Sequence, residues 1–373
     1  MAVTSFGGPL ALAALYAPGI VADATSSAGL AMVAAVVVFA FPLVIWLRYA
    51  ERINGSGGLY SFTEAAAGRK IALVQGGLWI FSYLLYLLYT TAQIVYDTLP
   101  AVFPGEQRYQ TLLEIAIPVA MTAVMIAGRW VTMLVIGLIA AGQLAIAGAL
   151  GGLTVANLDT HASTFGASAP AGSLAIAAGQ TSLLYICGSL PLFLGGEIAR
   201  PARTMRRGLV GVFLVTALVM TLAVAPLAAA PSIAATPIPG MTVANAFAGH
   251  GFGIAVGVGV AVSVAGVMIV EYLGLSRLIP TITSLSVRSV IIGIGVIVVA
   301  FAPVVLINPD RIYDDLLTPS LVALWLSQLV VFAVYPRYVR KQRGRMLPAW
   351  VLAAAACAFA IYGAWSAIHY SGS

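Results

Sequence analysis

Phe6-Gly7-Gly8-Pro9 interrupts an apolar run at the start of the chain, and Ile186-Cys187-Gly188-Ser189-Leu190-Pro191 interrupts a second run about 180 residues later. Proline removes a backbone donor and clashes with the preceding turn, and glycine costs about 1 kcal/mol relative to alanine inside a helix. We therefore predict that both runs are helices broken near a Gly/Pro pair. Interrupted membrane helices at matching places in two halves of a chain indicate a transporter site between inverted repeats, whereas a single interruption often only kinks a helix.

The composition of the whole chain is that of a protein dissolved in lipid. Of its 373 residues, 61% are hydrophobic and 8% are charged, whereas a soluble domain carries roughly 25% charged residues. Because one crossing takes about 20 apolar residues, the length allows about eleven transmembrane helices with short loops and no separate soluble domain. We place the spans at residues 3–22, 28–49, 71–96, 110–127, 130–155, 173–197, 208–230, 251–274, 287–306, 315–335 and 348–368.

The basic residues predict the orientation of these spans, since lysine and arginine gather in cytoplasmic loops. With the N-terminus inside, the inside loops hold all of the 18 basic residues except Arg108 and Arg311. An odd number of spans then puts the C-terminus outside. The net charge of +6 is thus a topology signal and does not indicate nucleic acid. We expect an integral protein of a bacterial or archaeal cytoplasmic membrane, with its oligomeric state left open.

Three loops carry motifs that resemble those of one known family. Tyr49-Ala50-Glu51 followed by Gly55-Ser56-Gly57-Gly58-Leu59-Tyr60-Ser61-Phe62 resembles the family stretch YAEL…P-x-GG-x-Y-x-Y between its second and third helices. Gly196-Glu197-Ile198-Ala199-Arg200-Pro201-Ala202-Arg203 resembles its E-x-x-N-P-x-R stretch, and Ser276-Arg277-Leu278 is similar to its SR-L loop. The family is the amino acid–polyamine–organocation (APC) superfamily, and the matches to it occur in the expected order over most of the chain.

The resemblance implies an all-α membrane fold of the leucine-transporter type, a five-plus-five inverted repeat in which helices 1 and 6 are broken. The first repeat would cover 1–157, the second 158–336, and 337–373 would add a basic cytoplasmic loop and an eleventh helix. It also implies alternating access around a midplane site, with amino acids or related amines as substrates. The chain departs from the family in having about eleven spans, where about twelve are usual. Only six residues precede Gly7, so either the start lies upstream or the inner half of span one is unusually short.

The two breaks predict a receptor for a zwitterion. A half-helix that starts at a break offers N–H groups and a partial positive charge, which suit a carboxylate, and the opposite half-helix offers carbonyls, which suit an ammonium group. We expect the carboxylate near Gly7, Gly8, Leu10 and Ala11. We expect the ammonium group near the carbonyls of Tyr185, Ile186 and Cys187, beside Gly188, with the Ser189 hydroxyl added.

Span three adds a candidate from a row of tyrosines. Tyr83, Tyr86 and Tyr89 share one helix face, and the third helix of the family lines the site. Tyr86, nearest the middle, is our choice for a substrate contact, whereas packing or a place at the membrane interface suits Tyr83 and Tyr89 better. Phe193 is a gate candidate, although packing in the core is the commoner role of such a residue.

Ionisable and polar residues inside spans are rare and supply the candidates for gating and coupling. Glu197 is expected to pair with Arg200 or Arg203, and Glu271 either to take part in proton coupling or to pair with Arg277. Some proton-coupled relatives carry a lysine in the fifth helix, near the position of Gln143 here. Ser263 would supply one oxygen of a sodium site, or bond back to its own helix. Sodium, proton and simple exchange stay open, and no other cofactor or metal is expected.

Other classes of function fit the sequence less well. The histidines do not cluster, and neither a Walker phosphate loop nor an HExxH motif is present, so we do not expect an enzyme or an ATP-driven pump. A channel would favour repeated polar pore rings, and a receptor a larger loop or domain. Within transporters, a polyamine, a nucleobase or another small metabolite is the alternative substrate. A polycation requires carboxylates at mid-membrane, where the sequence offers almost none, so a neutral amino acid is favoured.

Overall fold

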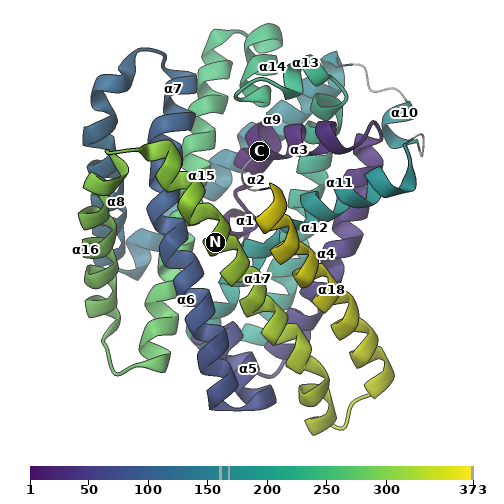
Figure 1. Ribbon diagram of the computed structural model, residues 1–373, viewed down its shortest axis with the longest axis vertical. Coiled ribbons are helices and arrows are strands. Elements are labelled where there is room, and N and C mark those ends of the chain that lie inside the picture. Colours follow the sequence, from purple (N-terminus) through teal and green to yellow (C-terminus); the bar gives the residue numbers. More distant parts are fainter. Residues whose placement is uncertain (159–161, 167–168, 371–373) are drawn as a thin grey trace.

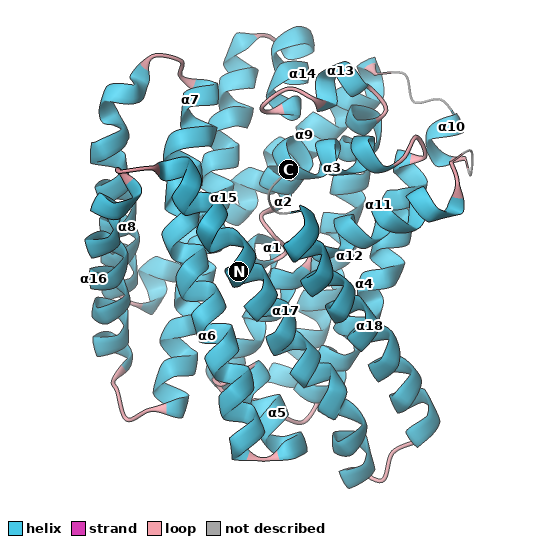
Figure 2. Ribbon diagram, viewed as in Figure 1, coloured by secondary structure: helices cyan, strands magenta, loops and turns pink. Residues whose placement is uncertain are grey.

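The computed structural model describes residues 1–158, 162–166 and 169–370, and these residues form helices and connecting turns without a strand (Figures 1 and 2). Within these described ranges, ten helical segments are long and apolar enough to cross a membrane. They contain α4 (Ala28–Ala50), α6 to α7 (Arg69–Val102), α8 (Gln110–Ile126), α9 (Arg129–Asn157), α11 with η4 (Ala171–Leu183 and Ile186–Glu197), α12 (Pro201–Ala228), α15 (His250–Ile282), α16 (Val287–Val305), α17 (Pro309–Lys341) and α18 (Met346–Tyr370).

The first predicted span consists of short pieces. They are α1 (Ala2–Ser5), α2 (Pro9–Ala11), the π-helical turn η1 (Leu12–Tyr16) and α3 (Ala17–Ala24). The segment between α6 and α7 is also π-helical, η2 (Gln93–Thr98). The remaining short helices lie in the connections: α5 (Leu59–Ala67), η3 (Glu106–Tyr109), α10 (Ala162–Phe165), α13 (Pro231–Ala234) and α14 (Pro239–Ala248). The predicted all-α membrane fold with interrupted helices in spans one and six is confirmed, and the boundaries of its two repeats stay a prediction.

The helices run alternately up and down, so the basic loops gather at one end of the bundle. This basic end carries α5 and the turn between α17 and α18, and the opposite end carries α13 and α14 (Figure 1). Arg108 and Arg311, the two exceptions in the predicted topology, lie at the opposite end, together with Asp97, Asp310 and Asp314. We call this the acidic end. The two ends therefore differ in charge as the loop pattern predicts.

Helix α15 is the centre of the packing. It contacts α6, α9, α16, η4 and the pieces α1, α2 and η1 of span one, and 72% of its most apolar window is buried, against 22% for α8 and for α9. The outer helices present apolar side chains outward, for example Leu134 (62% exposed) and Leu138 (65% exposed). In water such a surface would be unfavourable, whereas a lipid bilayer accommodates it. A buried polar group at the centre of the bundle therefore indicates a structural or functional role.

Candidate functional site

The break in span one depends on two glycines with backbone angles that other residues rarely adopt. Gly7 has φ +75° and Gly8 has φ +66°, the left-handed region that favours glycine. A Cβ atom on Gly7 would lie 2.8 Å from the carbonyl oxygen of Leu184, and one on Gly8 would lie 2.5 Å from Ser263 Oγ. Pro9 then occupies the first turn of α2, where its missing N–H is not needed. The Gly-Gly-Pro sequence therefore ends one helix and starts the next.

The break in span six lies directly against the break in span one. Helix α11 ends at Leu183, and after Leu184 and Tyr185 the chain continues as a 3₁₀ helix of 12 residues, η4. Runs of 3₁₀ helix longer than three or four residues are uncommon and often mark a functional hinge. A Cβ atom on Gly188 would overlap the ring of Phe6, and Gly7 approaches the Leu184 carbonyl. The two interrupted backbones thus meet at the centre of the bundle.

A chain of buried hydrogen bonds joins span one to spans five and eight. The N–H of Ala11 donates to Ser263 Oγ at 3.4 Å, the Ser263 hydroxyl donates to Gln143 Oε1 at 2.6 Å, and Gln143 Nε2 donates to Thr4 Oγ1 at 3.2 Å. All three side chains are at most 3% exposed. The structure thus brings together Gln143 and Ser263, the two coupling candidates, and adds Thr4, which the sequence analysis did not select. Ser263 donates to Gln143 and not to its own backbone.

A second polar group joins spans three, six and eight next to the break. Tyr83 Oη donates to Cys187 Sγ at 3.8 Å, and the Cys187 thiol donates to Glu271 Oε1 at 3.6 Å. Glu271 is fully buried, and its other oxygen, Oε2, has no hydrogen-bond partner. The expectation that mid-membrane carboxylates are almost absent was therefore wrong at this residue. The sequence analysis put Glu271 near the end of its span, whereas α15 runs on to Ile282, past Pro280, so Glu271 faces the break.

The tyrosines of span three form a continuous row toward the acidic end. Ring centroids lie 6.3 Å apart for Tyr83 and Tyr86, 5.1 Å for Tyr86 and Tyr89, and 5.4 Å for Tyr89 and Tyr313. Tyr86 and Cys187 are half-buried, although the residues around them are buried. At the acidic end of the row lies a pocket of about 190 Å³ lined by Ala92, Gln93, Tyr96, Asp97, Pro309, Asp310, Tyr313 and Asp314. The role of Tyr86 in binding stays a prediction.

The remaining residues of the predicted ammonium site bond mostly within their own helix. The Gly188 N–H donates to the Tyr185 carbonyl at 2.9 Å, and the Ser189 hydroxyl donates to the Ile186 carbonyl at 3.4 Å. A carbonyl oxygen has a second lone pair, so both remain able to accept. Gln328 of α17, which the sequence analysis missed, donates from Nε2 to Ser189 Oγ at 3.5 Å. Leu10 and Tyr185 are fully buried at the break.

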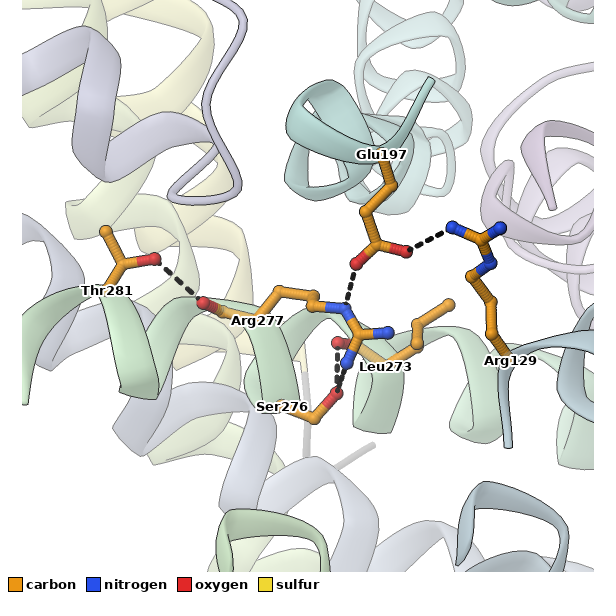
Figure 3. A network of polar contacts seen from close by, with 6 residues as sticks. All are labelled: Arg129, Glu197, Leu273, Ser276, Arg277 and Thr281. Atoms are coloured by element: carbon orange, nitrogen blue, oxygen red, sulfur yellow. Dashed lines mark hydrogen bonds and ion pairs between the residues drawn. The ribbon is translucent and has the colours of Figure 1, made fainter. Parts of the chain in front are cut away.

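The basic end below the break is closed by packing and by ion pairs. Phe193 is fully buried, its ring centroid 4.3 Å from that of Trp79, and a Cβ on Gly58 would overlap it. Figure 3 shows Glu197 of η4 between Arg277 of α15, which donates to Oε1, and Arg129 of α9, 3.9 Å from Oε2. Phe193 and Glu197 thus lie on the route from the break to this end.

The predicted partners of Glu197 were wrong. Arg200 has φ +53° as the cap before α12, and Glu197 forms its ion pairs with Arg129 and Arg277 instead. The turn before α12 directs Arg200 and Arg203 away from Glu197, whereas α9 and α15 converge on the end of η4. Since Arg277 is bound to Glu197, the suggested pair of Arg277 with Glu271 is not formed.

Comparison with known proteins identifies the arrangement of the helices. No protein-family model and no curated protein sequence matches the chain. Its structure is similar to that of a Na⁺-coupled sialic acid symporter in a substrate-bound outward-open state, with a TM-score of 0.62 and 11% identity over 99% of this chain and 89% of the other. The chain has the fold of a secondary transporter. At 11% identity, this likeness shows the fold of the chain and identifies neither its substrate nor its family.

Proposed function

We propose that this transporter-fold chain is a secondary active transporter, a permease of the APC type that moves an amino acid by alternating access. The observation that carries the proposal is the meeting of the two breaks, where Gly7 approaches the Leu184 carbonyl and Gly188 approaches Phe6. Backbone groups released in hydrocarbon must find partners, which is tolerable around a binding site. A core that serves only to pack helices together does not require two broken helices in contact.

The substrate class follows from the charges that the breaks offer. The start of α2 supplies the N–H of Leu10 for a carboxylate at the break near Gly7 and Gly8. The N–H of Gly8 donates to the Thr4 carbonyl at 3.0 Å and that of Ala11 donates to Ser263, so a carboxylate would have to replace these bonds to use them. On the other side lie the carbonyls of η4 and the single carboxyl group of Glu271. One carboxyl group matches one ammonium group, so a neutral amino acid fits better than a polyamine, which would leave further positive charges unpaired.

The orientation in the membrane follows from the basic residues. The basic end would face the cytoplasm and the acidic end the outside, in keeping with the rule for lysine and arginine. With the basic end closed by Phe193 and by the Glu197 ion pairs, we infer that the described conformation is closed to the cytoplasm. Alternating access would then require η4 to move away from Arg129 and Arg277.

A sodium ion at Ser263 fits the described hydrogen bonds poorly. The Ser263 hydroxyl donates to Gln143 and already accepts from Ala11, so a cation would have only the remaining lone pair of its oxygen and would lie next to the Ala11 N–H. A lysine at position 143 would offer an ionisable group, whereas the glutamine amide has none. We therefore propose that Gln143 and Ser263 hold the two halves of the bundle together and that ion coupling belongs to another group.

The test is uptake of the standard amino acids, one at a time, into liposomes that contain the purified protein. We expect at least one neutral amino acid to accumulate above empty liposomes, and Gly8→Leu and Gly188→Leu to abolish its uptake. Gly142→Leu is the matched control, because its helical position on α9 has no atom within 4 Å of an added Cβ. Uptake retained by both Gly8→Leu and Gly188→Leu, or uptake of no amine-bearing solute at all, would contradict the proposal.

A further inference from the structure

We propose that Glu271 is a single site at which a proton and the ammonium group of the substrate exclude each other, so that transport exchanges an amine for a proton. The inference rests on the proposed transport function and adds to it the coupling ion and the group that carries it. Three observations support it: the lack of a counter-charge at Glu271, the accessible surface next to it, and the row of tyrosines that leads outward.

Among the residues that the structure describes, Glu271 has no partner that would neutralise a negative charge. Its Oε1 accepts a bond from the Cys187 thiol, which is a weak donor, and its Oε2 is buried without a partner. The arginine nearest on its own helix, Arg277, is bound to Glu197, and so is Arg129. A buried carboxylate without a cation is strongly disfavoured relative to the protonated acid. In the described conformation the group is therefore a carboxylic acid.

The groups that face Glu271 are neutral at ordinary pH. The thiol of Cys187 comes from η4, and the phenols that interact with the carboxyl group come from α6, namely Tyr83, Tyr86 and Tyr89. The other titratable or charged groups on elements packed against α15 are the Met1 amine, Tyr16, Arg69, Lys70, Tyr96, Asp97, Glu114, Arg129, Glu197 and Arg288. Within the described part of the chain, none of these forms an ion pair or hydrogen bond with Glu271.

Accessible surface lies beside Glu271, and a row of tyrosines, in which Tyr83 and Tyr89 are at most 3% exposed, joins it to a pocket at the acidic end. Tyr86 and Cys187 keep accessible surface beside the buried carboxyl group. The faces of tyrosine rings attract ammonium groups, and the row from Tyr83 to Tyr313 ends at the pocket lined by Asp97, Asp310 and Asp314. A cluster of negative charge at the entrance raises the local concentration of cations. The acidic pocket, the tyrosine row and Glu271 thus favour the same charge.

The exchange balances in atoms and charge. The carboxylic acid of Glu271 loses its proton to water as the ammonium group arrives, and the carboxylate then pairs with the ammonium ion. No bond of the substrate is broken, and one proton leaves for each amine bound. With a proton or an ammonium group bound, the site has no uncompensated charge. The empty site would hold an unpaired carboxylate. The transporter can therefore change between its outward-facing and inward-facing conformations with a proton or an ammonium group bound at Glu271, but not with the site empty.

The direct test is the count of protons released when the purified transporter binds its solute. The probes are the standard amino acids and the amines formed from them by loss of the carboxylate, screened for thermal stabilisation and then added in a weakly buffered solution with a pH indicator. We expect close to one proton per bound solute. The dissociation constant should fall up to tenfold for each unit rise in pH, because the solute binds the deprotonated carboxyl group.

Glu271→Gln keeps the shape of the side chain and removes the exchangeable proton. We expect no proton release, a dissociation constant that does not change with pH, and binding weakened at least tenfold. Glu114→Gln is the matched control, since Glu114 is a second buried glutamate with an unpartnered oxygen, on α8 and away from the break. It should behave like the unaltered protein. If the glutamine variant is unstable, Glu271→Asp is the substitute test. It keeps a carboxyl group, so it should release a proton when the solute binds.

The outcomes separate this inference from the proposed function. Binding and uptake of an amino acid without proton release, or with release that survives Glu271→Gln, would overturn the role of Glu271 and leave the transporter assignment intact. Release that is lost in Glu114→Gln and kept in Glu271→Gln would move the proton site to α8. Binding and uptake of no amine-bearing probe would overturn the proposed function itself.

Discussion

Gly188 of span six lies against the ring of Phe6 of span one, so closely that a Cβ atom on Gly188 would overlap that ring. Phe6 is fully buried, and its ring also lies 6.5 Å from that of Tyr185. The two residues are 182 positions apart in the sequence, and both sit where a helix is interrupted. The contact ties the two breaks into one structural unit, and the predictions below concern that unit and the groups around it.

The first prediction concerns the glycines of the first break. Gly7→Ala and Gly8→Ala each put a Cβ at positive φ and within 2.8 Å of another atom, so each should lower the free energy of unfolding by about 1–3 kcal/mol. Gly142→Ala, in open space on α9, should be neutral or stabilising by up to about 1 kcal/mol. Chemical or thermal unfolding in detergent measures the difference, and equal effects at positions 8 and 142 would contradict the described break.

The second prediction concerns the hydrogen bonds of Gln143. Gln143→Leu leaves the hydroxyls of Thr4 and Ser263 without their partner, which should destabilise the protein by about 1–3 kcal/mol. Ser263→Ala alone should have an effect of similar size, and the double variant should cost less than the two single effects added, because they remove the same interaction. Strict additivity in this double-mutant cycle would show that the two side chains do not interact.

The third prediction concerns the closure of the basic end by Glu197. In a Cys357→Ala background the remaining thiol is Cys187, which lies at the break above Phe193. Glu197→Gln weakens both ion pairs of η4, so we expect Cys187 to react several-fold faster with a membrane-impermeant thiol reagent applied to the basic end. Glu64→Gln, on the exposed part of α5, is the control. An unchanged rate in Glu197→Gln would show that these ion pairs do not hold that end closed.

The fourth prediction concerns the hydroxyl groups of the tyrosine row. Tyr83→Phe removes the donor to Cys187 and leaves the ring contacts, so we expect a stability loss of about 1 kcal/mol or less and retained solute binding. Tyr86→Phe should leave stability unchanged and weaken binding several-fold if its hydroxyl contacts the solute. Isothermal titration of the best amino acid against both variants distinguishes the two roles. Binding unaffected by Tyr86→Phe would remove Tyr86 from the site.

Much of the fold was predictable from local signals in the sequence. Apolar runs of the right length gave the spans, and Gly7-Gly8-Pro9 and Gly188 with Pro191 gave the breaks, because glycine and proline act on the backbone where they stand. The end of the span predicted at 251–274 was placed too early, since α15 runs on to Ile282 with Pro280 inside the helix. Helix ends in lipid are decided by neighbouring helices, which a single sequence does not display.

The polar contacts of the site were less predictable, because they join residues far apart in the chain. Gln143 and Ser263 were selected from their positions in spans five and eight, and the structure brings them within 2.6 Å. Glu197 was paired with arginines a few residues away, whereas its partners come from α9 and α15. The position of Glu271 opposite Cys187 depends on how far α15 is rotated and shifted against η4, which no motif records.

The central claim is that the two interrupted helices together form the binding site of a transporter. A structure determined with the most stabilising amino acid bound tests it most directly. We predict that the solute lies between Gly7–Gly8 and Tyr185–Gly188, with its ammonium group within hydrogen-bond distance of Glu271. A solute bound solely in the pocket of Asp97, Asp310 and Asp314, with both breaks packed as in the solute-free protein, would contradict it.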